Sequence, residues 1–238
     1  MTLADMLYEC TKQICKYMLS RRYGKEPEVF GLENVPSAPY VVVGNYLDYI
    51  EGPLAIINAV PDRMYPLAAD VWMDRDKALP QAKKTFTKKY GDSMFVKMGA
   101  VAWGNFYPWL LNYTGSIRLP RDDDNRGAVG VKQTYKESAD VLLDGRVLAI
   151  MPEYRKGEPD ENHMWPYQPG AARIIKHALN YLDEVKLVIL GVSYKTGNVM
   201  FAPYLTITKE TFEDDRKGLK LTSRIEDITR EMVVEMNG

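Results

Sequence analysis

The chain has 238 residues, 46% of them hydrophobic and 26% charged, which is the composition of a globular protein long enough to bury its own core. Its 31 basic and 32 acidic side chains leave a net charge of −1, so nothing in the overall charge favours nucleic acid as a partner, and we expect none. Cys10 and Cys15 fit neither a zinc site nor a redox pair, and with only two histidines we expect no metal site.

Residues 1–25 predict an amphipathic helix at the N-terminus. Leu3, Leu7, Cys10, Ile14 and Met18 recur at helical spacing, while lysines and arginines gather along the helix and at its end. Such a helix either lies on an anionic bilayer or docks on its own domain, and the sequence leaves both alternatives open.

The sequence shows neither a signal-peptide pattern nor an apolar run of about 18 residues that would span a bilayer. We therefore expect a protein that is not secreted and that meets membranes only at their surface, on a cytoplasmic or organelle-internal face.

Beyond residue 25, short apolar runs alternate with segments of helical periodicity. This alternation predicts a single α/β domain over residues 26–238, with a mostly parallel central sheet flanked by helices. The predicted strands are 40–43, 66–71, 115–121, 146–153, 185–194 and 199–207. The predicted helices are 50–60, 131–143, 170–182 and a final helix that opens at Ser223, with Glu226 in a capping-box pattern.

Residues 74–98 differ from the rest, because they hold six lysines and few acids. They lead into "AVAWGNFYPWLLNY" (100–113), which is dense in large aromatic residues. Lysines beside tryptophan and tyrosine are typical of an element at a membrane interface. A solvated basic helix followed by a core helix explains the same pattern, and both interpretations stay open.

Polar residues lie at the ends of three of the predicted strands, at 45–51, 118–121 and 153–155. In open α/β sheets, ligands bind beyond the carboxyl ends of the strands. Arginine pairs with phosphate in a bidentate manner, so the arginines at these ends predict a pocket for a phosphorylated ligand.

The order of these segments resembles the glycerolipid acyltransferase family, the lysophosphatidate acyltransferase or PlsC-like group. The family's motifs are Asn-His-x-Ser-x-x-Asp, Gly-x-Ile-x-x-x-Arg, Phe-Pro-Glu-Gly-Thr-Arg and Val-Pro-Val-Gly. The matching segments are "GNYLDYIE" (44–51), "GSIRLPR" (115–121), "MPEYR" (151–155) and "VILGVSY" (188–194). The resemblance covers residues 30–207, with 74–98 as an insertion between the first two motifs.

This resemblance implies a glycerol-phosphate acyltransferase-like fold and acyl transfer to a lysophospholipid or glycerol phosphate. The donor would be an acyl-CoA or an acyl-carrier-protein thioester, with no resident cofactor. In the family, the first-motif histidine is the general base and the aspartate orients it. Carried over by position, the phosphate-binding candidates are Arg121, Glu153 and Arg155, with Arg118 a weaker addition.

The first motif departs from the family at its chemical positions, where Tyr46 replaces the histidine and Glu51 the aspartate. The pKa of a phenol is about 10, so only about one part in a thousand is phenolate at pH 7. The carboxylates of Asp48 and Glu51 disfavour phenolate further. His163 lies in the loop before the 170–182 helix. Its imidazole either reaches the cleft or is exposed on the surface, and the sequence leaves both alternatives open. His177, in mid-helix, fits packing better than catalysis.

Two functions remain open. One is an acyltransferase-family protein of phospholipid metabolism, impaired or inactive because the His/Asp pair is missing. The alternative is a catalytically inactive phospholipid-binding protein or a structural subunit of a membrane protein complex. Either one implies a peripheral membrane protein whose partners are a phospholipid or lysophospholipid, the membrane surface and, in the second case, other subunits.

Overall fold

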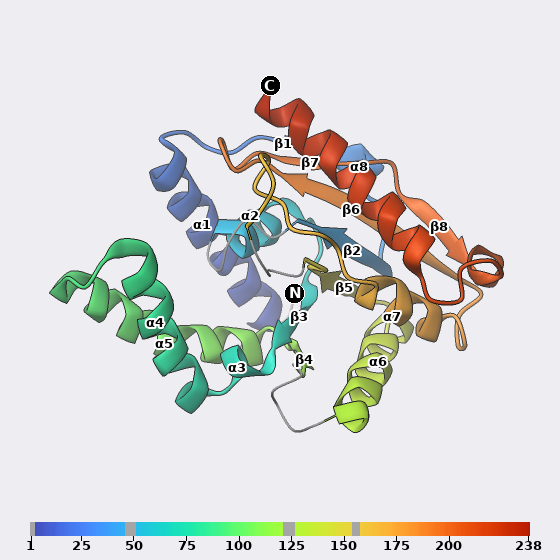
Figure 1. Cartoon of the computed structure of the whole chain (residues 1–238), viewed down its shortest axis with the longest axis horizontal. Coiled ribbons are helices and arrows are strands. Elements are labelled where there is room, and N and C mark those ends of the chain that lie inside the picture. The colour runs from blue at the N-terminus through green and yellow to red at the C-terminus, as the bar shows by residue number, and fades with distance from the viewer. Residues whose placement is uncertain (1–2, 46–50, 121–126, 154–157) are drawn as a thin grey trace. The chain divides into compact units, whose positions relative to one another are not determined.

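The computed structural model describes residues 3–45, 51–120, 127–153 and 158–238 (Figure 1). The chain divides into two compact units. The first unit combines Met1–Met64 with Ser138–Gly238, and the second is Tyr65–Glu137. The segment 74–98, predicted as an insertion, lies within the second unit, which extends beyond it on both sides.

The sheet of the first unit is mostly parallel and has the strand order β1-β7-β6-β2-β5. Strand β2 pairs in parallel with β5 on one side and with β6 on the other, while β7 and β8 run antiparallel to β6. The strands are β1 (Val29–Phe30), β2 (Tyr40–Gly44), β5 (Val147–Ile150), β6 (Glu184–Val192), β7 (Val199–Phe201) and β8 (Leu205–Thr208).

Strand β2 is at the centre of the core because all five of its residues are buried. A strand that is covered on both faces reads as a continuous apolar run rather than an alternating one, which is how Tyr40 to Val43 reads. The apolar runs that predicted β2, β5 and β6 are therefore confirmed as strands, and the α/β class with a mostly parallel, helix-flanked sheet is confirmed with them.

Helices cover both faces of this sheet. Leu190 packs in a cluster with α1 (Leu3–Tyr23) and α2 (Glu51–Ala59). The next residue, Gly191, lies against Met232 and Val233 of α8 (Leu219–Asn237). Because successive strand residues point to opposite faces, α1 and α2 cover one face and α8 the other (Figure 1). Helix α7 (Gly170–Ala178) contacts α8.

Helix α1 docks on the first unit, which is one of the two alternatives for residues 1–25. Cys15 and Leu19 are buried in the core cluster, and the Lys12 ammonium donates to the Val60 carbonyl oxygen at 3.1 Å. Its other side leaves Ile14 and Tyr17 exposed.

Two sequence predictions in the C-terminal region are wrong. The strand predicted over 199–207 is two strands, because Pro203 lacks the amide that a continuing ladder needs. The final helix begins at Leu219 rather than Ser223. Its first turn is capped by the Asp215 carboxylate, which accepts from the amides of Leu219 at 2.7 Å and Leu221 at 2.9 Å.

In the second unit, α4 and α5 form an antiparallel hairpin beside a short parallel strand pair. Leu67 of β3 pairs with Ile117 of β4. The bounds are β3 (Met64–Ala69), α3 (Asp70–Met73), α4 (Arg75–Tyr90), α5 (Met94–Tyr113) and β4 (Ile117–Leu119), and α6 (Gly127–Leu143) runs from this unit into the first. Short 3₁₀ turns occupy Leu32–Asn34 and Lys209–Phe212. Among the described helices, none has both the length and the apolarity to cross a membrane.

Candidate active site

The carboxyl ends of β2 and β6 are joined by the side chain of Asn45. Its Nδ2 donates to the Val192 carbonyl oxygen at 2.9 Å, and its Oδ1 accepts from the Val192 amide at 2.7 Å. The preceding Gly44 lies so close to Leu190 that an added Cβ would come within 2.4 Å of the leucine side chain. The Gly-Asn pair therefore holds the position from which the first motif leaves the sheet.

Glu51 is the first residue of α2 and is engaged in an ion pair. The Arg22 guanidinium, from the end of α1, donates through Nε to Glu51 Oε1 at 2.9 Å. The Glu51 side chain is only 14% exposed, while that of Arg22 is 63% exposed. A carboxylate that accepts from a guanidinium is a poor proton acceptor for an alcohol, because the pairing stabilises its proton-free form.

Glu153 follows β5 and lies beside the buried phenol of Tyr167. The two residues form an isolated antiparallel bridge, and the Gln168 amide donates to the Pro152 carbonyl oxygen at 2.9 Å. Burial raises the pKa of Tyr167 well above its usual value, and the negative charge of Glu153 adds to this effect. The structure therefore holds the third motif and the end of the segment before α7 together.

The loop over 158–168 is fixed to α8 and presents His163. The Asp160 carboxylate accepts from the amides of Asn162 and Met164, both at 2.9 Å, and pairs with the Arg230 guanidinium. His163 has a left-handed backbone with φ of 58° and an exposed side chain.

The His163 ring packs on Tyr194, with ring centroids 4.2 Å apart. Tyr194 lies two residues beyond the end of β6, and β6 runs parallel to β2 with Leu190 opposite Gly44. An imidazole is thus held at the end of the sheet where the first motif begins. His177, by contrast, is half-buried on α7 and makes an edge-on contact with Tyr181.

Arg118 lies on β4 in the second unit, where its side chain is half-buried. Its carbonyl oxygen accepts from the Thr134 hydroxyl of α6 at 2.7 Å. Four other predicted site residues, Tyr46, Asp48, Arg121 and Arg155, lie outside the described residues. Their roles stay predictions.

The sequence reasoning missed the roles of Asn45 and Arg22. A polar residue at the end of a fully apolar strand indicates a buried side chain that must find hydrogen-bond partners, and this signal identifies Asn45. Nothing in the sequence indicates that Arg22 pairs with Glu51.

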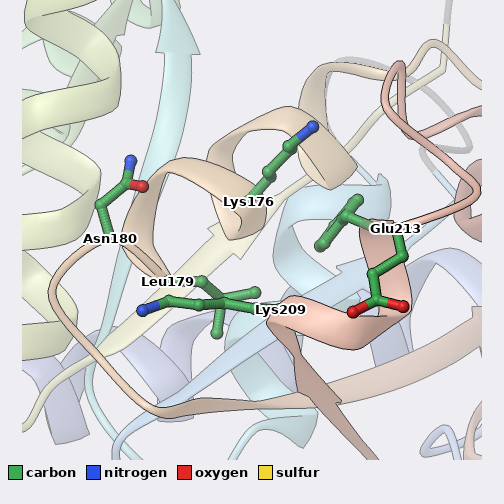
Figure 2. A pocket seen from close by; sticks show the side chains of 6 residues that line it. Lys176, Leu179, Asn180, Lys209 and Glu213 are labelled. Atoms are coloured by element: carbon green, nitrogen blue, oxygen red, sulfur yellow. The ribbon is translucent and has the colours of Figure 1, made fainter.

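A shallow pocket of about 160 Å³ opens elsewhere in the first unit, between α7 and the Lys209–Phe212 turn (Figure 2). The Lys176 ammonium there donates to the Arg216 carbonyl oxygen at 2.9 Å. Its lining is Lys176, Leu179, Asn180, Lys209, Phe212 and Glu213, so none of the predicted site residues contributes to it. Within the described residues, no group of three or more histidine, cysteine, aspartate or glutamate side chains is placed to hold a metal ion.

Comparison with solved structures shows a likeness to the crystal structure of the 1-acyl-sn-glycerophosphate (LPA) acyltransferase PlsC from Thermotoga maritima. The match covers 99% of this chain and 81% of that chain, with a TM-score of 0.60 and 14% sequence identity. A scan against models of protein families and a search of curated proteins gave no match. The likeness shows that the chain has the fold of that acyltransferase.

Proposed function

We propose that this protein is a glycerolipid acyltransferase-family member that binds a lysophospholipid or glycerol phosphate and whose acyl transfer is impaired or absent. The observation that carries the proposal is the ordered set of four motif-like segments on a fold that matches the Thermotoga maritima PlsC over 99% of the chain. Neither feature alone is specific, but a chance similarity is not expected to produce both.

Phosphate binding rests on arginines that lie on or just after strands. Arg118 lies on β4, and Arg121 and Arg155 follow β4 and β5 in the sequence. Guanidinium groups suit a phosphate because they donate two parallel hydrogen bonds to its oxygens. Glu153 stands at the position of the family's third-motif glutamate, and we assign it to the same acceptor site.

Acyl transfer requires a base that removes a proton from the acceptor hydroxyl. The oxygen of that hydroxyl would attack the thioester carbon, the carbon–sulfur bond would break, and the thiolate of CoA or of the carrier protein would leave. Tyr46 is a poor acceptor of the proton at neutral pH, because the ordinary pKa of a phenol is about 10. Glu51 does not replace the missing base, since it is paired with Arg22.

A second candidate is a protein that binds phospholipid without turnover, or a structural subunit of a membrane protein complex. The Arg22–Glu51 pair favours this candidate, because it ties the first motif to α1 instead of leaving a carboxylate to orient a base. Either function places the protein at a membrane surface on the cytoplasmic or organelle-internal side, and needs no metal or resident cofactor.

The test measures binding and turnover separately on the same preparation. Binding of lysophosphatidate is measured by calorimetry, and turnover by the release of free CoA thiol from oleoyl-CoA. We expect binding without measurable thiol release by the wild-type chain. Arg155→Ala should weaken binding by about tenfold or more, since a charged hydrogen bond contributes about 1.5–3 kcal/mol. The matched control, Arg224→Ala on the exposed side of α8, should bind as the wild type does.

The catalytic half of the proposal has its own variants. Thiol release that appears in Tyr46→His combined with Glu51→Asp supports a scaffold that lost its base. If the wild type releases thiol, and Glu51→Ala or Tyr46→Phe abolishes that release, the proposal of impaired acyl transfer is contradicted. A wild type that neither binds lysophosphatidate nor releases thiol contradicts the binding function as well.

A further inference from the structure

Helix α5 carries an apolar face that is open to solvent along much of its length. Phe95 is 85% exposed and Met94 is 75% exposed, although both are large apolar side chains. At about 100° per residue, these residues fall within an arc of about 140°, so they lie on one side of a helix about 30 Å long. This apolar face consists of Met94, Phe95, Met98, Val101, Phe106 and Trp109.

The opposite side of α5 is packed, so this exposure does not come from a loose helix. Gly104 lies against Leu79 and Ala82 of α4, where an added Cβ would come within 2.8 Å of the Leu79 Cα atom. The Ser93 hydroxyl caps α5 by accepting from the Val96 amide at 3.3 Å. On the same side as the apolar face, the Asn105 amide oxygen of α5 accepts from the Arg75 side chain of α4 at 2.6 Å. The hairpin therefore presents a defined outer face.

The hairpin that carries this apolar face is also basic. Lys83, Lys84 and Lys88 on the partner helix α4 are exposed. Lys97, on α5 itself, is exposed and pairs with Asp92 at 3.0 Å, and exposed pairs of this kind contribute little. Over residues 74–113 the sequence has seven basic and three acidic side chains, a net charge of +4. The basic ones are Arg75, Lys77, Lys83, Lys84, Lys88, Lys89 and Lys97, and the acidic ones are Asp74, Asp76 and Asp92.

We propose that the apolar face of α5 inserts into the interface of an anionic lipid bilayer, with the lysines of α4 contacting lipid phosphates. Aromatic and methionine side chains lose exposed apolar area by entering the boundary between headgroups and acyl chains, where tryptophan is favoured. Each lysine near an anionic surface adds attraction, so the two features act together.

A bilayer fits this face better than a second copy of the chain. Two copies that met through their apolar faces would bring two hairpins of net charge +4 together, and like charges oppose association. A bilayer with anionic headgroups offers the complementary charge and an apolar interior side by side. The inference names the surface through which the protein of the proposed function would meet the membrane, and its test is independent of that function, since it requires neither an acceptor lipid nor an acyl donor.

The test is sedimentation of the full-length protein with vesicles that contain no lysophospholipid. One set of vesicles is phosphatidylcholine alone, and the other includes phosphatidylglycerol. We expect binding mainly to the anionic set. Phe95→Glu combined with Met98→Glu should reduce that binding by about tenfold or more. Lys84→Glu combined with Lys88→Glu should do the same, since each lysine contributes about fivefold and each reversal adds repulsion.

The matched control is Val129→Glu combined with Val131→Glu, which places the same two charges at exposed aliphatic residues of α6 and should bind like the wild type. Circular dichroism verifies that each variant is folded. Vesicles with brominated acyl chains should quench Trp109 fluorescence, and Trp109→Phe should lose that quenching.

Three results would overturn the proposal. The first is equal binding by the Phe95/Met98 variant and the wild type, and the second is equal binding to neutral and anionic vesicles. The third is a wild-type dimer in light scattering that the same variant converts to monomer, since this assigns the face to a second copy. Failure of the lysophosphatidate test with intact vesicle binding would leave this inference standing, so the two failures are distinguishable.

Discussion

Asn45 and Val192 are joined by two hydrogen bonds, from the Asn45 side-chain amide to the Val192 carbonyl oxygen at 2.9 Å and from the Val192 amide back to Asn45 at 2.7 Å. Asn45 is fully buried, and its side chain takes the place of a backbone partner at the end of β2. It thereby fixes the exit of the first motif relative to β6.

Asn45→Ala should lower the free energy of unfolding by about 1–3 kcal/mol, because the buried amide and carbonyl of Val192 lose their partner. Urea unfolding followed by tryptophan fluorescence measures this change. The exposed Asn180→Ala is the control and should change stability by no more than about 0.5 kcal/mol. Equal midpoints for the two variants would contradict the structural role of Asn45.

His163→Ala addresses the imidazole that packs on Tyr194. We expect it to leave lysophosphatidate binding unchanged and thiol release at the background level of the wild type. A wild-type rate that falls by about a hundredfold or more in this variant, but not in His177→Gln, would identify His163 as the general base. That result would contradict the impaired function.

The two cysteines should differ in reactivity. Cys10 is exposed, whereas burial raises the pKa of the Cys15 thiol to about 12. Because the thiolate is the reactive form, a disulfide reagent at pH 8 should titrate one thiol in the folded protein and two after unfolding. The fast thiol should be absent in Cys10→Ser and present in Cys15→Ala. Rapid reaction of both thiols in the folded wild type would contradict the burial of Cys15.

Stability should fall at alkaline pH because of buried phenols. Burial, followed by the charge of Asp62, raises the pKa of Tyr40 far above its ordinary value. The folded state thus keeps a proton that the unfolded state releases above about pH 10, so the free energy of unfolding decreases as pH rises past that point.

Tyr40→Phe should remove up to one proton from this dependence, about 1.4 kcal/mol per pH unit, as followed by urea unfolding between pH 8 and about 11. At neutral pH the same variant should lose about 1 kcal/mol, since the hydroxyl donates to Asp62 at 3.0 Å. Tyr204→Phe, at an exposed position, should change neither quantity. An unchanged alkaline slope in Tyr40→Phe would refute the assignment.

Asp215 should stabilise α8 only while it is ionised. Burial alone would raise the pKa of its carboxyl, but the amides of Leu221, Lys220 and Leu219 donate to it and hold the pKa below its usual value. A lowered pKa in the folded state gives stability that is present above about pH 4 and is lost as pH falls through the folded-state value.

Asp215→Asn should therefore cost about 0.5–2 kcal/mol at pH 7, and its difference from the wild type should vanish in strong acid. Thermal unfolding across this pH range is the measurement. The control is Asp214→Asn, at the neighbouring exposed residue, which should have the same stability as the wild type across this pH range. A cost that persists unchanged at low pH would show that the Asp215 charge is not the cause.

The failed fold predictions share a physical cause. Val199 to Ile207 is apolar enough to read as one strand, but a single proline divides it, and both halves turn antiparallel to β6. The spacing of Ser223 and Glu226 matches a capping box, yet Asp215 caps the helix one turn earlier. In both cases a single nearby residue, Pro203 or Asp215, outweighed a valid local pattern.

On its own, the sequence determined the α/β class, the buried strands β2, β5 and β6, and the strand ends where polar residues gather. These follow from local composition and periodicity, which report burial without reference to distant residues. The tertiary structure decided what those polar residues contact. Arg22 reaches Glu51 across 29 positions, Asn45 reaches Val192 across 147, and His163 meets Tyr194, because a side chain's partners depend on how distant segments pack.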